Sequence, residues 1–138
     1  MNISGLQKMT LLDYPGKVAC TVFTGGCNFR CPFCHNASLV THIDGAPIEE
    51  QEILSYLIKR KGILDGVCIT GGEPLLQPDI ADFLRRVRAH GYAVKLDTNG
   101  SFPEKLAALK TGDVLWPIYD RNLHDVVEDA VSVTANIV

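Results

Sequence analysis

The sequence predicts an α/β fold in which a parallel sheet is built from about four βα units. Short apolar segments rich in β-branched residues alternate along the chain with segments whose apolar residues have helical spacing. Each such unit needs roughly 30 residues, so a chain of 138 residues holds about four of them. A closed eight-stranded barrel needs about 250 residues and is excluded. We therefore expect an open sheet or an arc of a barrel.

The expected strands are short and bounded by turn residues. They are residues 18–23, 67–70, 92–96 and 113–116. The first is apolar, partly β-branched and flanked by Gly16 and Gly25, which is typical of a buried strand. The second leads directly into Gly71.

The expected helices carry their apolar residues on one face. They are residues 53–58, 78–91, 101–109 and 122–131. The first places both Ile53 and Ile58 on its inner face, and Gly62 ends it. Ser101 and Glu104 fit a capping box for the third. Alternation of strands and helices implies right-handed crossovers between parallel strands.

Composition and charge exclude several classes of function. Hydrophobic residues make up 46% and charged residues 21% of the chain, as in ordinary globular proteins. The net charge of −3 argues against nucleic acid as the main partner. No apolar run approaches the roughly 18 residues that a membrane span needs, and the N-terminal segment lacks the apolar core of a signal peptide. We expect a cytoplasmic protein with no nucleic-acid or membrane partner.

Three of the five cysteines form a tight cluster. Cys27, Cys31 and Cys34 have C-x3-C-x2-C spacing in a loop that follows the first predicted strand. Thiolates suit zinc or an iron–sulfur cluster, but a structural zinc site needs four ligands. Cys20 lies within a strand, and His35 follows Cys34 without a spacer. A [4Fe–4S] cluster with three cysteines leaves one iron open to substrate; a zinc knuckle or three buried thiols remains the alternative.

The cysteine segment CNFRCPFC matches the C-x3-C-x-aromatic-C signature of the radical S-adenosylmethionine (radical SAM) enzymes, with Phe33 at the aromatic position. The wider stretch GLQKMTLLDYPGKVACTVFTGGCNFRCPFCHN resembles the activating enzymes of glycyl-radical proteins. It is most similar to the anaerobic ribonucleoside-triphosphate reductase activating proteins. The pyruvate formate-lyase activating enzymes are the second most similar group. The resemblance covers about residues 3–100.

This resemblance implies a partial (β/α) barrel and two cofactors. Cys27, Cys31 and Cys34 would ligate a [4Fe–4S] cluster, whose open iron is chelated by S-adenosyl-L-methionine. One electron cleaves the cofactor to methionine and a 5′-deoxyadenosyl radical. That radical would install a glycyl radical on a partner enzyme, expected to be an anaerobic ribonucleotide reductase. Flavodoxin or ferredoxin would donate the electron.

A glycine-rich motif follows the second predicted strand. Taken alone, Gly71-Gly72-Glu73-Pro74 could be an ordinary strand-to-helix turn, although glycines allow a ligand to approach the backbone. The resemblance assigns Gly71, Gly72 and Glu73 to a clamp for the methionine amine of the cofactor.

A third motif, Asp97-Thr98-Asn99-Gly100, ends the third predicted strand. It could be an Asn-Gly turn without a ligand role. Because ligands in parallel α/β folds gather at the carboxyl ends of strands, the three motifs are expected on one rim. The resemblance places Asp97 and Thr98 near the cofactor carboxylate and Phe33 near its adenine. His35 is a candidate donor to the cofactor carboxylate or to a cluster sulfur, with a solvent-facing loop residue as the alternative.

The match to the family weakens toward the C-terminus. A six-unit partial barrel needs roughly 180 residues at about 30 per unit, and the resemblance is lost after about residue 112. We therefore expect a single, C-terminally shortened domain over residues 1–138, with its site rim more exposed than in a full barrel. Two alternatives remain. One is a relative that binds a cluster or metal without turnover. The other is a different radical SAM enzyme, such as a pyruvate formate-lyase activase.

Overall fold

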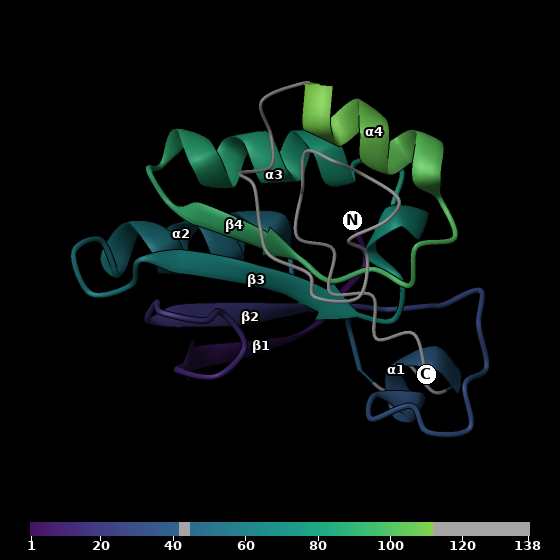
Figure 1. Ribbon diagram of the computed structural model, residues 1–138. Helices are drawn as coiled ribbons and strands as arrows, with labels where there is room; N and C mark the ends of the chain where they lie inside the picture. The colour runs from purple at the N-terminus through teal and green to yellow at the C-terminus, as the bar shows by residue number, and fades with distance from the viewer. Residues whose placement is uncertain (42–44, 112–138) are drawn as a thin grey trace.

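One four-stranded sheet forms the centre of the computed structural model, which describes residues 1–41 and 45–111 (Figure 1). The strands lie in the order in which they occur in the chain. They are β1 (Ile3–Thr10), β2 (Ala19–Thr24), β3 (Gly66–Gly71) and β4 (Ala93–Leu96). Strands β2, β3 and β4 run parallel, which confirms the predicted α/β fold.

The three parallel strands are those that the sequence predicts, with ends that differ by one residue. Val22 pairs with Ile69, and Ile69 pairs with Leu96, so one apolar row crosses the sheet. All three side chains are fully buried. Buried strands of this kind read as nearly continuous apolar runs, which is why the sequence places them well.

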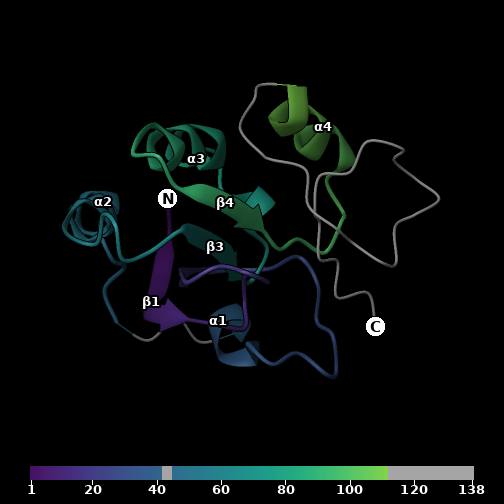
Figure 2. The ribbon, with the colours of Figure 1, turned by 60° about the vertical axis from the view of Figure 1, so that its left-hand side comes forward.

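Helices α2 (Glu50–Lys59) and α3 (Ile80–Ala89) cover one face of the sheet and lie side by side (Figure 2). Ile53 and Leu57 from α2 pack in the same core cluster as Phe83 and Leu84 from α3. The expectation for Ile58 was wrong, because its side chain is 55% exposed. One position beyond Leu57, it lies past the edge of the buried stripe.

Strand β1 is a correction to the all-parallel sheet expected from sequence. It pairs antiparallel with β2, with Leu6 opposite Val22 and Gln7 opposite Thr21. Only its first and last residues, Ile3 and Thr10, are buried. An edge strand of this kind is held by backbone hydrogen bonds to its neighbour, so its sequence lacks a clear apolar alternation.

Three further elements lie outside the sheet and the two covering helices. They are α1 (Ala37–Thr41), the 3-10 turn η1 (Pro74–Leu76) and α4 (Pro103–Thr111). The expected capping by Ser101 is not observed: α4 begins at Pro103, and the Ser101 hydroxyl donates to Asn99 Oδ1 instead. The predicted strand 113–116 and helix 122–131 lie outside the described residues. Among the residues described, no helix has the length and apolar character that crossing a bilayer requires.

Candidate functional site

The three sequence motifs meet at the carboxyl ends of the parallel strands, as predicted. The backbone amide of Gly72 donates to the carbonyl of Thr24 at 2.9 Å, and that of Glu73 donates to the carbonyl of Gly26 at 2.8 Å. These bonds tie the turn after β3 to the loop after β2. From the other side, the amide of Gly26 donates to the carbonyl of Leu39 in α1 at 3.0 Å. The cysteine loop is therefore fixed at its first residues by two neighbouring elements.

Glycine is required at the point where these two loops touch. A Cβ built on Gly72 would overlap the carbonyl oxygen of Gly26 and lie 2.6 Å from its carbonyl carbon. The preceding Gly71 has a φ of +117°, a region that side-chain-bearing residues rarely adopt. A Cβ on Gly71 would also overlap backbone atoms of Thr24, so Gly71 is required both for its conformation and for close packing, whereas the need at Gly72 is steric.

The cysteine loop presents three free thiols. Cys27 and Cys34 are half-buried and Cys31 is exposed. A turn joins two of them, because the amide of Cys34 donates to the carbonyl of Cys31 at 3.1 Å. Within residues 1–41 and 45–111, no three His, Cys, Asp or Glu side chains are grouped as ligands of a single metal ion. The side chains of Phe33 and His35 on the same loop are exposed.

The donors around Cys27 suit an iron–sulfur cluster. Its sulfur accepts from the backbone amide of Phe29 at 3.4 Å and from the side-chain amide of Asn99 at 3.8 Å. Hydrogen bonds from N–H groups to ligand sulfur are a usual feature of such sites. With three thiols on one loop and a glycine-lined turn beside it, the residues at this rim fit the predicted cluster and cofactor.

Glu73 connects the second and third motifs from a fully buried position. Its Oε1 accepts from the backbone amide of Leu75 at 2.9 Å and from the hydroxyl of Thr98 at 2.6 Å. Its Oε2 accepts from the backbone amide of Asn99 at 2.7 Å. The resemblance assigns Glu73 to a cofactor clamp, and that role stays a prediction; in the structure its carboxylate holds the turn that follows β4. Thr98 is also buried, and its side chain faces Glu73.

Asp97 faces a polar cluster on the sheet surface opposite α2 and α3. Its Oδ1 pairs with the ammonium of Lys95 at 2.6 Å, and its Oδ2 accepts from the Cys68 thiol at 3.4 Å. Thr21, Cys68 and Lys95 are aligned across the three parallel strands. Sequence reasoning gave no role to Lys95, although a lysine inside a buried strand is itself a signal that it has a partner.

The two cysteines outside the loop are buried in strands, as predicted. Burial raises the pKa of the Cys20 thiol to about 11. Burial also raises the pKa of the Cys68 thiol, and the nearby Asp97 carboxylate raises it further. Both side chains are fully buried. Both are therefore neutral thiols near pH 7. Cys20 packs in the apolar core, as predicted. Cys68 instead contacts the polar side chains of Asp97 and Lys95 on the opposite face of the sheet, which corrects the expectation of a small apolar residue there.

The difference in exposure between Cys31 and the buried Cys20 and Cys68 predicts a labelling pattern for the metal-free protein under anaerobic conditions. Iodoacetamide at pH 8 should modify Cys31 first, while Cys20 and Cys68 stay unmodified. The thiolate is the form that reacts, and the two buried thiols stay protonated and out of contact with the reagent. Mass spectrometry of peptides measures the pattern. In denaturant all five cysteines should react. Modification of Cys68 in the folded protein as fast as Cys31 would contradict this placement.

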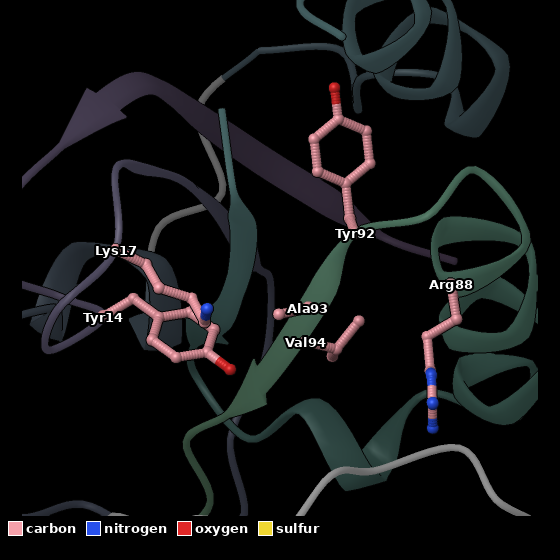
Figure 3. A pocket seen from close by; sticks show the side chains of 6 residues that line it. All are labelled: Tyr14, Lys17, Arg88, Tyr92, Ala93 and Val94. Carbon is pink, nitrogen blue, oxygen red and sulfur yellow. The ribbon is translucent and has the colours of Figure 1, made fainter. Parts of the chain in front are cut away.

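A hollow of about 300 Å³ lies elsewhere, beside the start of β4. In Figure 3 the side chains of Tyr14 and Lys17 lie on one side of this strand and that of Arg88 on the other. Its charged groups therefore do not converge, and it is separate from the three motifs. The rim at the carboxyl ends of the strands remains the candidate site.

The model of the Radical SAM superfamily matches residues 21–120, a range that contains all three motifs. The chain belongs to the radical SAM superfamily. This membership confirms the family expected from the cysteine signature, and it implies a [4Fe–4S] cluster and S-adenosylmethionine as cofactors. The assignment of each cofactor contact to a residue stays a prediction.

Several curated relatives of this radical SAM chain are activating enzymes. A protein of Methanocaldococcus jannaschii assigned as a glycyl-radical enzyme activating enzyme is 36% identical over 110 residues, which cover 78% of this chain and 44% of that protein. The pyruvate formate-lyase-activating enzyme of Clostridium pasteurianum is 35% identical over 103 residues, 71% of this chain and 43% of the enzyme. These names support the expected activating branch.

A relative of another activity also matches. The 7-carboxy-7-deazaguanine synthase of Methanopyrus kandleri is 28% identical over 138 residues, which cover 81% of this chain and 55% of that enzyme. The chain thus spans about half the length of these curated relatives.

Proposed function

We propose that this radical SAM chain is an activating enzyme that installs a glycyl radical on a partner protein. The observation that carries the proposal is that the three motifs lie together at one rim of the sheet. There Gly26 accepts from Glu73, and Cys27 accepts from Asn99. When bound, a [4Fe–4S] cluster and S-adenosylmethionine supply a 5′-deoxyadenosyl radical for hydrogen abstraction from a glycine.

The residues of this chain bind and orient the two cofactors. Cys27, Cys31 and Cys34 hold the cluster and leave one iron open. The turn of Gly71 and Gly72 receives the methionine amine through its backbone. The buried Glu73 carboxylate supports this turn by bonding Leu75 N and Thr98 Oγ1.

The remaining contacts come from the edges of the site. In this proposal Phe33 packs near adenine and His35 lies near the cofactor carboxylate. Asp97 borders the site with its orientation fixed by Lys95. Because Phe33 and Cys31 are exposed, a partner protein must cover this rim to keep water from quenching a carbon radical.

The partner in this proposal is an anaerobic ribonucleotide reductase, and the electron donor is flavodoxin or ferredoxin. The stretch LDYPGK before the cysteine loop supports this choice by its resemblance to that subgroup. A pyruvate formate-lyase is the competing partner, favoured by the name of the Clostridium pasteurianum relative. Electron paramagnetic resonance with each partner separately distinguishes them, because only the true substrate acquires a stable glycyl radical.

Cysteine substitutions test the cluster assignment. The protein reconstituted anaerobically with iron and sulfide should contain about four irons per chain, and should form 5′-deoxyadenosine with dithionite and S-adenosylmethionine. Cys31→Ala should lose the iron and the visible absorption of the cluster. The matched variant Cys20→Ala should keep both, because Cys20 is buried on the helix-covered face. Equal loss of iron in the two variants would rule out the three-thiolate assignment.

A second candidate is a radical SAM enzyme that acts on a small molecule. The similarity to the 7-carboxy-7-deazaguanine synthase of Methanopyrus kandleri favours it. The two candidates differ in how 5′-deoxyadenosine relates to the protein radical. One 5′-deoxyadenosine formed per glycyl radical supports the activating enzyme, whereas conversion of a small-molecule substrate to product in the absence of a protein partner supports the small-molecule enzyme.

A further inference from the structure

We infer that Asn99 is a positioning residue that raises the reduction potential of the cluster by donating a hydrogen bond to the sulfur of Cys27. Its side-chain nitrogen Nδ2 lies 3.8 Å from Cys27 Sγ. The inference rests on the proposed binding of a cluster by Cys27, Cys31 and Cys34, and goes beyond it by assigning an electronic role to a residue outside the cysteine loop.

The orientation of the Asn99 amide follows from its other bonds. Its oxygen Oδ1 accepts from the backbone amide of Ser101 at 3.0 Å and from the Ser101 hydroxyl at 2.6 Å. A side-chain amide has one accepting end and one donating end. Because the Ser101 backbone N–H can only donate, the accepting end must face Ser101. The donating NH₂ group is therefore the end that faces Cys27.

A closed ring of hydrogen bonds holds this amide in place. Asn99 Nδ2 donates to Asn28 Oδ1 at 2.9 Å, and Asn28 Nδ2 donates to the Ser101 hydroxyl at 2.9 Å. The Ser101 hydroxyl completes the ring by donating to Asn99 Oδ1. Each member polarises the next, so the ring is more rigid than its separate bonds. The Nδ2 group of Asn99 therefore has two acceptors, Asn28 Oδ1 and Cys27 Sγ, one for each of its N–H bonds.

The backbone of Asn99 is anchored independently of this ring. Its amide donates to Oε2 of the buried Glu73 at 2.7 Å. Thr98, the preceding residue, donates to the other oxygen of the same carboxylate. The side chain thus projects from a fixed turn at the end of β4 toward a loop that follows β2. The donor and the sulfur thus come from the ends of β4 and β2, the two strands on either side of β3.

A hydrogen-bond donor at a ligand sulfur changes the reduction potential of the cluster. The N–H dipole stabilises negative charge on sulfur, and the reduced cluster carries one more negative charge than the oxidised one. Hydrogen bonds to sulfur are among the factors that set cluster potentials. Loss of the Asn99 donor should therefore make the cluster harder to reduce, without removing a ligand.

The test is a redox titration of the reconstituted protein without S-adenosylmethionine, followed by electron paramagnetic resonance of the reduced cluster. Asn99→Ala should retain the wild-type iron content but show an equilibrium constant for one-electron reduction about tenfold lower, a fall of about 59 mV. The matched variant Asn28→Ala loses the other amide of the ring but leaves the donor to sulfur, and its potential should stay close to that of the wild type.

The outcomes separate this inference from the proposed function. A wild-type protein that binds no iron overturns both before any variant is compared. A loaded Asn99→Ala protein with the wild-type potential overturns the inference alone. So do equal falls in Asn99→Ala and Asn28→Ala, because these would reflect a loosened loop. If Asn99→Ala binds no iron, Asn99→Ser decides. Its hydroxyl can still accept from the Ser101 backbone amide in a serine turn, but it carries no NH₂ group to donate to Cys27. The potential of Asn99→Ser should therefore fall, and an unchanged potential overturns the inference.

Discussion

Replacing Glu73 by Ala is expected to lower the free energy of unfolding by roughly 4 kcal/mol, because two buried donors and one half-buried donor lose their acceptor. The donors are the amides of Leu75 and Asn99 and the hydroxyl of Thr98. An unsatisfied buried donor costs about 1–3 kcal/mol, and the fully buried carboxylate also leaves a void. Urea unfolding of the metal-free protein, followed by circular dichroism, measures the loss.

Two further variants give this experiment its controls. Glu73→Gln keeps one oxygen acceptor but turns an NH₂ group toward another donor, so its loss should be intermediate. Glu52→Ala removes an exposed carboxylate from the first turn of α2, and should cost less than about 1 kcal/mol. If Glu73→Ala were no less stable than Glu52→Ala, the carboxylate would not hold the turn after β4.

Replacing Gly72 by Ala should cost about 3 kcal/mol of stability, at the upper end of the usual cost of overpacking. The new Cβ would overlap the backbone carbonyl of Gly26, which cannot swing away as a flexible side chain can. Separation of the two backbones would also stretch the bond from the Glu73 amide to the Gly26 carbonyl. The cysteine loop should then lose its fixed position, so iron loading of Gly72→Ala should fall along with its stability.

Gly5 in β1 offers a matched control for this substitution. A Cβ there would meet only the Phe23 ring and Cβ at 3.6 Å or more, an ordinary contact. Gly5→Ala should therefore be neutral, or stabilising by about 0.4–1 kcal/mol through a smaller loss of chain entropy. Denaturant midpoints and iron content of both variants are the measurements. Wild-type iron content and stability in Gly72→Ala would show that the close approach at this rim is unnecessary.

The sequence by itself determined the elements that bury an apolar face. Val22, Ile69 and Leu96 lie in short, mainly apolar runs, and Ile80, Phe83 and Val87 recur at helical spacing, so each segment carries its own local signal. It also placed the three motifs on one rim, because every parallel strand ends at the same edge of a sheet. The cysteine spacing is equally local, since all three thiols lie within one loop.

Only the tertiary structure decided which polar groups face one another. Glu73 and Asn99 are 26 residues apart, and nothing in the local pattern of either motif specifies a bond between them. The same is true of Lys95 beside Cys68 and of the antiparallel pairing of β1, which depends on backbone hydrogen bonds to β2. The spacing of apolar residues in the sequence indicates which side chains are buried. A hydrogen-bond partner depends instead on how distant segments pack, and this is why only the fold shows that Glu73 holds the turn after β4.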